Sequence, residues 1–473
     1  MTLRKYDMDL TQGPILKNML AYSLPVMFAA LLQVFYNAAD TAVVGKFAYN
    51  GEEAMAAVGA TSALNNLIIN ILTGLSVGAT AIVARYYGAK QDKEVSDAVH
   101  TTMGVGLLGG ILIGVFGYFT VRVWLHLMGT PDSIISLSVQ YCKIIFIGLP
   151  FSMVFNFGAS ILRAVGDTKR PLYILALSGI VNVVFNIFFV TVFNWSVEGV
   201  AVATVISQAL SACLVVLSLT KNEGSLKYFV SKTYLHRKQV LEIFRIGFPT
   251  AIQGSMFSLS NVLIQSTVNT FGEVAMAGNT VACNLGGFVY TSFNAYNHAS
   301  LAFAGQNYGA REYNRLYKIV RHGMFLAGVS GFLTGMLVWI LGNPLMSFYT
   351  DSTEIMKWGN LRNQVVCTTY FICGMQEVLI GYLRGLGESL KPALISLFCI
   401  CGLRVAWIYT AVPIFRAAYS EQASFSFLYV CYPITWIVIL VALYFLYKHK
   451  KKELKKEQAE FDQKNITALS SVE

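Results

Sequence analysis

Charged side chains are scarce in this sequence. Asp, Glu, Lys and Arg together make up 13% of its 473 residues, whereas an ordinary soluble domain carries about 25%. Hydrophobic residues make up 55%. This composition is typical of a chain that spends most of its length inside a lipid bilayer rather than in water.

Sequence signatures of catalysis and of nucleotide binding are also lacking. We find no Walker-type phosphate loop, no HExxH and no GxSxG, which argues against ATP hydrolysis and against a membrane enzyme. A GxGxxG does occur at Gly104, Gly106 and Gly109, but it lies in an apolar stretch with no strand before it. Together with the small-residue spacing of Gly106, Gly110 and Gly114, it predicts close helix packing instead. The eight cysteines are scattered, which favours apolar packing roles over disulfides or a metal site.

Long apolar runs fill the chain and predict an all-α, polytopic membrane protein. Each run reaches the roughly 20 residues that a helix needs to cross a bilayer. The twelve predicted spans are 18–46, 56–83, 98–121, 136–162, 171–193, 198–219, 240–270, 276–304, 320–341, 359–383, 392–414 and 424–447.

The basic residues predict how these spans are oriented. If the N-terminus is cytoplasmic and the loops alternate, 28 of the 35 Lys and Arg residues fall on the cytoplasmic side. This bias matches the positive-inside rule and places both termini in the cytoplasm. It also accounts for the net charge of +10, so we expect no nucleic-acid partner. We expect a multi-pass protein of the bacterial inner membrane, with lipids as its neighbours, acting as a monomer.

The chain contains an internal duplication. LRAVGDTKRP at 162–171 recurs as LRGLGESLKP at 383–392, and YGAK at 87–90 recurs as YGAR at 308–311, both 221 residues later. Pro25 matches Pro249 at an offset of 224; each predicts a hinge or a static bend in its helix. Six spans per copy predict two parallel six-helix bundles, an architecture used by alternating-access transporters. The predicted parts are a bundle at 1–220, a cytoplasmic linker at 221–239, a bundle at 240–447 and a basic tail at 448–473, disordered beyond its basic run.

Two carboxylates lie inside predicted spans, Asp40 in the first and Glu377 in the tenth. Inserting a charged side chain at the centre of a membrane helix costs about 2.5–3.5 kcal/mol, so such residues are functional by default. Asn182, Asn186 and Thr204 lie at a depth similar to that of Asp40 and could converge on it. The alternative for the amides is that they merely link helices, and the alternative for Glu377 is an ion pair with Arg404 on the next span.

The duplication separates the polar cluster from the scaffold. Position 264, equivalent to Asp40, is Ile, and position 407, equivalent to Asn186, is Trp. A purely architectural acid would be expected in both copies. The cluster therefore predicts a function confined to the first bundle.

With this cluster in view, the chain resembles the multidrug and toxic compound extrusion (MATE) family, in its bacterial DinF-like branch. The resemblance covers all twelve spans. It rests on the two six-span halves and on YNAADT at 36–41, ARYYGA at 84–89, LRAVGD at 162–167, ATVISQ at 203–208 and LRGLGE at 383–388.

The resemblance implies an efflux antiporter that exchanges an inward H⁺, or Na⁺, for an outgoing organic cation or drug, with no other cofactor. It assigns cation coupling to Asp40, Asn182, Asn186 and Thr204, and substrate binding to Gln33, Tyr36, Asn37 and Asn156. Many relatives carry an acid at the position of Asn186. This chain therefore has one negative charge fewer at this position than those relatives, which makes a Na⁺ site less favourable. Glu377 is a possible second acid.

Burial disfavours the charged carboxylate, so Asp40 could take up a proton from outside. Protonation would remove the charge that holds a cationic substrate. A flippase and an ion channel are the alternatives. A flippase for lipid-linked or polysaccharide precursors tends to carry more spans or a basic cavity. An ion channel would need a filter-like loop, and none is evident.

Overall fold

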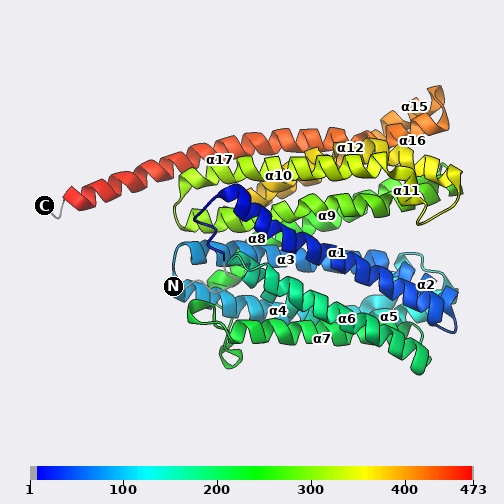
Figure 1. The fold of residues 1–473 in the computed structure, drawn as a ribbon, viewed down its shortest axis with the longest axis horizontal. Helices are drawn as coiled ribbons and strands as arrows, with labels where there is room; N and C mark the ends of the chain where they lie inside the picture. The colour runs from blue at the N-terminus through cyan, green and yellow to red at the C-terminus, as the bar shows by residue number, and fades with distance from the viewer. Residues whose placement is uncertain (1–7, 471–473) are drawn as a thin grey trace. The chain divides into compact units, whose positions relative to one another are not determined.

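A computed structural model describes residues 8–470, without the side chains of residues 232 and 464–470. The first seven residues of the predicted N-terminal bundle and the last three of the predicted tail lie outside this range. The described chain consists of helices and connecting turns, with no strand (Figure 1). The predicted all-α membrane fold is confirmed.

Each predicted span falls on helical chain. The helices of the first half and the linker are α1 (Ile15–Phe47), α2 (Gly51–Ala60), α3 (Ser62–Gly88), α4 (Asp92–Leu127), α5 (Asp132–Ala164), α6 (Lys169–Val192), α7 (Val197–Thr220), η1 (Gly224–Leu226) and η2 (Val230–Lys232). Those of the second half are α8 (Arg237–Asn269), α9 (Glu273–Gly309), α10 (Tyr313–Ile340), α11 (Gly342–Met346), α12 (Thr353–Gly385), α13 (Leu390–Leu397), η3 (Phe398–Leu403), α14 (Arg404–Ala406), η4 (Trp407–Ala411), α15 (Val412–Ala418), α16 (Glu421–Tyr429) and α17 (Cys431–Ser470).

Ten spans in the described chain are both long and apolar enough to cross a membrane. The two predicted spans that fall short are α8 and α9, which have 33 and 37 residues but are interrupted by Asn, Gln, Ser and Thr. Polar side chains of both helices face protein rather than lipid, as at Ser260 of α8 and Asn279 and Asn297 of α9, all buried. A buried helix face explains why hydropathy alone understates these two helices.

The chain forms two compact units whose limits differ from a simple division into halves. Unit 1 contains Phe28–Tyr86 and Gln91–Ala251, and unit 2 contains Asp9–Met27, Tyr87–Lys90 and residues from Ile252 onward. The predicted boundaries at 220 and 240 remain predictions. In both α1 and α8 the chain passes from one unit to the other two residues after a proline, Pro25 or Pro249.

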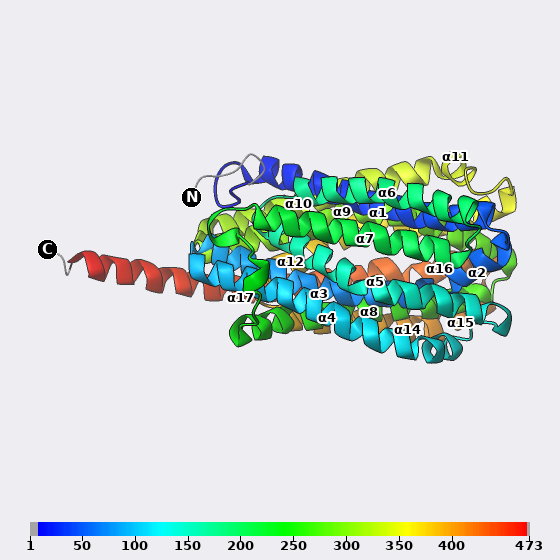
Figure 2. The ribbon, with the colours of Figure 1, turned by 90° about the horizontal axis from the view of Figure 1, so that it is seen from below.

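Within unit 1, α5 lies between α4 and α7, and α6 packs on α7 (Figure 2). The glycines of α4 allow its close approach to α5. A Cβ at Gly110 would lie 2.5 Å from the Cα of Pro150, and one at Gly114 would lie 2.6 Å from the carbonyl oxygen of Phe146. The glycine pattern therefore serves helix packing, as predicted.

Within unit 2, α12 is the central helix and packs against α9, α10 and α17 (Figure 1). Its core includes aromatic residues of α9, α12, α16 and α17, among them Phe293, Trp358, Phe425 and Trp436. The prediction of a disordered tail is wrong for the described part, because α17 continues to Ser470. The tail is rich in Glu, Lys, Gln and Ala, which favour helix, and Lys450 pairs with Glu453 one turn away at 2.8 Å.

Candidate functional site

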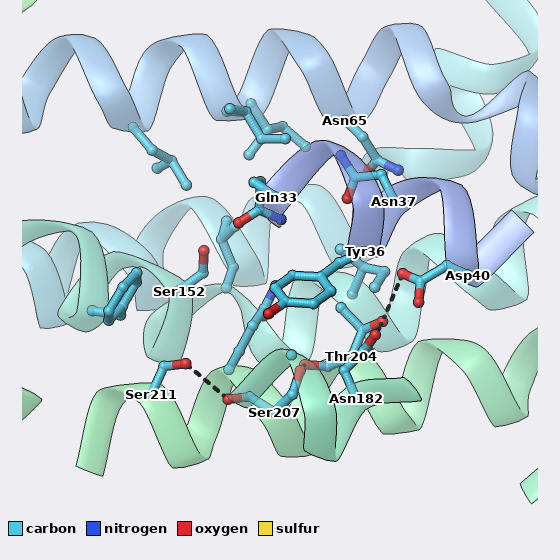
Figure 3. Close-up of a pocket in the computed structure, with 18 of the residues that line it drawn as sticks. Gln33, Tyr36, Asn37, Asp40, Asn65, Ser152, Asn182, Thr204, Ser207 and Ser211 are labelled. Atoms are coloured by element: carbon cyan, nitrogen blue, oxygen red, sulfur yellow. Dashed lines mark hydrogen bonds between the residues drawn. The ribbon is translucent and has the colours of Figure 1, made fainter. Parts of the chain in front are cut away.

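A cavity of about 510 Å³ lies inside unit 1, between α1, α3, α5, α6 and α7 (Figure 3). Its wall mixes apolar side chains with amides and hydroxyls. Among the described lining residues Asp40 is the one carboxylate, and no Lys, Arg or His accompanies it. The cavity therefore offers one acidic group in an otherwise neutral wall.

The sequence spacing on two helices builds this wall. Tyr36 and Asn37 are adjacent, and each lies three or four residues from both Gln33 and Asp40, so the four side chains share one face of α1, as Figure 3 shows. Asn182 and Asn186 on α6 are four residues apart and share a face in the same way.

Asp40 belongs to a closed ring of four side chains. Asn186 donates from Nδ2 to Oδ1 of Asp40 at 2.5 Å and also to Oδ1 of Asn182 at 3.3 Å. Asn182 donates from Nδ2 to Oγ1 of Thr204 at 3.3 Å. Thr204 lies 3.4 Å from Oδ2 of Asp40 and shares its hydroxyl proton with the carbonyl of Val200, at 2.9 Å. The four predicted coupling residues are thus in contact.

Each chain of hydrogen bonds in this ring ends with a donor to the carboxylate of Asp40. Both oxygens of Asp40 accept, which is the arrangement that an ionised carboxylate requires. Asp40 is only 9% exposed, and no basic side chain in the described chain pairs with it. The Oδ1 of Asn186 is buried and accepts no hydrogen bond from residues 8–470. Neutral dipoles alone therefore stabilise the charge of Asp40.

The four predicted substrate-binding residues, Gln33, Tyr36, Asn37 and Asn156, all line the cavity. Tyr36 crosses toward α6 and its hydroxyl lies 3.3 Å from the carbonyl oxygens of Leu175 and Ala176. The Nδ2 of Asn156 donates to the carbonyl of Ser152 within α5.

Sequence reasoning missed three amides that also line the cavity, Asn65, Asn66 and Gln208. The Oε1 of Gln208 is buried and accepts no hydrogen bond from the described residues. A signal was present: Asn65 and Asn66 are adjacent polar residues in an apolar span, and Gln208 ends the ATVISQ motif.

Glu377 does not line this cavity and belongs to α12 of unit 2. Its Oε2 accepts from Nδ2 of Asn297 at 2.7 Å. The alternative of a pair with Arg404 is not what the structure has: the Nε of Arg404 donates to Thr435 instead, at 3.4 Å. Glu377 and Arg404 lie in consecutive predicted spans, but their side chains have separate partners.

Comparisons with known proteins agree with this architecture. A model of the MatE family matches residues 25–188 and 249–410, which is most of both halves. The chain belongs to the MATE family.

Relatives of this MATE protein match over nearly their whole length. It is 27% identical to "Probable multidrug resistance protein YoeA" of Bacillus subtilis, over 93% of this chain and 95% of the relative. It is 24% identical to "Probable multidrug resistance protein NorM" of Thermotoga maritima, over 85% of this chain and 87% of the relative. The family relatives are transporters, and this MATE protein is a multi-pass membrane protein of that bacterial family.

A solved structure shows the same fold. An "outward-facing conformation of a multidrug resistance MATE family transporter of the MOP superfamily" superposes with a TM-score of 0.87. The match covers 96% of this chain and 100% of the other, at 20% identity.

Proposed function

We propose that this protein exports organic cations from the cell in exchange for protons, by alternating access, with Asp40 as the coupling residue. The observation that carries the proposal is the isolation of Asp40: a nearly buried carboxylate on the cavity wall whose hydrogen-bond partners are all neutral. An acid without a fixed counter-charge can exchange a proton for a cationic ligand. An acid in a permanent ion pair could not do so at similar cost.

The cavity suits a drug-sized cation. Its volume lies within the roughly 300–1,000 Å³ that ligand pockets occupy, and Asp40 supplies the one negative charge on its wall. The rings of Tyr36 and Phe155 also line it and offer faces to a cation. A polysaccharide precursor would need a larger space, so a flippase is the weaker candidate.

The orientation of the Asn186 amide depends on whether Asp40 is protonated. With Asp40 ionised, Asn186 presents its NH₂ group and its own Oδ1 has no partner. Protonation gives Asp40 an O–H that needs an acceptor. A half-turn of the Asn186 amide then brings its free oxygen toward that proton and withdraws a donor from Asn182. This exchange changes the contacts of α1 with α6 and couples the proton to the shape of the cavity.

The same geometry favours H⁺ over Na⁺. A Na⁺ site needs several oxygen ligands around one point, whereas an amide NH₂ occupies one oxygen of Asp40. With Asn at position 186, a second carboxylate is missing there. We further propose that the protein acts as a monomer in the bacterial inner membrane, with both termini in the cytoplasm, as the distribution of basic residues indicates.

Proteoliposomes loaded with a fluorescent cation such as ethidium test the proposal. An inward pH gradient should drive export by the wild type, and a Na⁺ gradient at constant pH should not. Asp40→Asn should abolish the pH-driven flux, while Asp132→Asn, an exposed acid at the start of α5, should leave it intact. pH-driven flux through a correctly folded Asp40→Asn protein would refute the role of Asp40. Flux driven only by Na⁺ would refute proton coupling.

A further inference from the structure

Arg404 is a fully buried cation in unit 2 that the proposed function does not use. Its exposed fraction is 0%, and its guanidinium lies 4.2 Å from the ring centroid of Tyr432 and 5.8 Å from that of Phe257. Only Nε has a hydrogen bond, to Thr435. Nη1 and Nη2 are buried and have no hydrogen-bond partner among residues 8–470. The outer edge of the guanidinium, the part that binds anions, is thus unsatisfied.

The surroundings do not compensate this charge. In the described chain no carboxylate forms an ion pair with Arg404, and Glu377 is held by Asn297. A buried cation without a counter-charge costs several kcal/mol, so such groups are normally paired or bind a ligand. Two aromatic faces reduce this cost but offer no hydrogen-bond acceptor to Nη1 and Nη2.

A second buried arginine reinforces the positive potential. Arg362 on α12 is 5% exposed and lies 5.5 Å from the ring centroid of Tyr429. Its Nη1 donates to the carbonyl of Ala282 at 3.0 Å, while its Nε has no partner in the described structure. The rings of Tyr429 and Tyr432 are 6.1 Å apart, so the two arginines flank one aromatic wall. Both are cations, and neither can neutralise the other.

The backbone around Arg404 is irregular in the way that ligand sites often are. Arg404–Ala406 is a single α-helical turn between two π-helical segments, Phe398–Leu403 and Trp407–Ala411. π-Helical turns are rare and are frequently found at functional sites.

The internal duplication places Arg404 one residue after the position that is equivalent to Asn182 in the first copy. Leu403 is equivalent to Asn182 of the Asp40 ring, at the offset of 221, and Arg404 follows it directly. Ile264 stands where Asp40 would be. One copy therefore carries an unpaired acid at this depth and the other an unpaired base.

We propose that unit 2 binds a small monovalent anion, a halide or a carboxylate group, on Nη1 and Nη2 of Arg404. The guanidinium supplies two parallel N–H donors to it, a geometry that suits both kinds of anion. The site is separate from the cavity at Asp40 and adds an anion to a transporter whose first unit takes cations.

Anion-dependent thermal stability of the purified full-length protein tests the site. Tm is measured at fixed Na⁺ concentration and pH while a bulky sulfonate, which carries neither a halide nor a carboxylate, is replaced stepwise by chloride or, in a second arm, by acetate. An anion at about ten times its Kd favours the folded state roughly elevenfold, which we expect to appear as a rise in Tm of about 2 °C that continues with the logarithm of the anion concentration above Kd. A rise with chloride alone identifies a halide site, and a rise with acetate alone a carboxylate site. A wild-type protein that responds to neither anion would overturn the proposal.

Variants locate the response. Arg404→Gln should lose the rise, whereas Arg122→Gln, an exposed arginine on α4, should keep it. Thr435→Val is the second variant, for use if Arg404→Gln does not fold. It keeps the guanidinium but removes the hydrogen-bond partner of Nε, so the guanidinium is no longer held in place and the anion response should weaken. Asp40→Asn should retain the full response, which separates this proposal from proton coupling. If the protein carrying Arg404→Gln folds and responds like the wild type, the anion binds elsewhere and the assignment to Arg404 is wrong.

Bromide gives a direct readout on the wild type. Crystals grown with bromide should show an anomalous peak within hydrogen-bond distance of Nη1 or Nη2 if the halide form is correct. A wild-type protein stabilised by chloride whose only bromide peaks lie at the molecular surface would contradict the site.

Discussion

The ring of Tyr36 lies directly against Gly179, in the space that any side chain at position 179 would occupy. A Cβ there would lie 1.7 Å from Cζ of Tyr36. Gly179 therefore sets the position of the ring, and through it the hydroxyl that reaches the carbonyls of Leu175 and Ala176. Absence of a side chain on α6 thus shapes one wall of the cavity.

We expect Gly179→Ala to displace the Tyr36 ring into the cavity and to weaken binding of an organic cation about tenfold, which corresponds to about 1.4 kcal/mol. Fluorescence titration with ethidium measures the Kd. Gly287→Ala on α9 is the matched control, because its Cβ would meet no atom within 4 Å. Unchanged affinity in the protein with Gly179→Ala would show that the ring position does not matter for binding.

Asn186→Leu removes the shortest hydrogen bond to Asp40 while keeping a side chain of similar size. Loss of a donor to the charged form favours the protonated form. We therefore expect the pH profile of proton-driven export to move toward alkaline values, by about one pH unit for about 1.4 kcal/mol. Initial rates of cation export at a series of external pH values measure this shift. Asn156→Leu, which lines the cavity but lies outside the ring, should leave the profile in place.

The contacts within the ring of Asp40, Asn182, Asn186 and Thr204 could be predicted in part from sequence spacing and membrane depth. The i, i+4 relation of Asn182 and Asn186, and the similar depth of Asp40 and Thr204, suffice to predict that these residues meet. The direction of each hydrogen bond, and the unsatisfied oxygen of Asn186, depend on the rotation of α6 about its axis, which spacing does not determine. The orientation of Asn65 and Asn66 toward the cavity depends on the rotation of α3 in the same way, so spacing does not predict it.

Other features depend on tertiary contacts that no local pattern records. Pro25 and Pro249 predict bends, but not that α1 and α8 each pass from one compact unit to the other beside them. Arg404 lies in an apolar span beside an available acid, Glu377, so a pair was a reasonable alternative. The competing contacts with Thr435 and Tyr432 come from α17, which is distant in sequence.

His100 holds the linker against the N-terminal part of α4. Its Nδ1 donates to the carbonyl of Ser96 at 2.8 Å, which leaves Nε2 to accept the backbone N–H of Phe229 at 3.1 Å. The ring stacks on Tyr234 with centroids 5.5 Å apart.

We expect His100→Phe to keep the stacking but to leave the Phe229 N–H without its acceptor. Loss of this hydrogen bond costs about 1–2 kcal/mol and raises the open population of the linker about 5- to 30-fold. The rate of tryptic cleavage after Lys227 reports that population. His126→Phe, at the exposed opposite end of α4, is the control and should be cleaved at the wild-type rate. Equal rates for both variants would mean that the hydrogen bond of His100 does not hold the linker.

Glu242 joins α8 to α3 inside unit 1. Its Oε2 accepts from Nη2 of Arg85 at 2.5 Å and from the hydroxyl of Tyr86 at 3.0 Å. The two charged side chains are 27% and 26% exposed, so water screens the pair. We expect a coupling energy of about 0.5–1 kcal/mol between Arg85 and Glu242, because partly exposed pairs contribute little.

A double-mutant cycle of Arg85→Gln and Glu242→Gln, followed by thermal unfolding in detergent, measures this coupling. Both partners belong to the same compact unit, so the pair need not break when the transporter alternates. The variants should therefore lose stability without losing export per folded molecule. Export that falls much further than the folded fraction would instead assign the pair to the transport cycle.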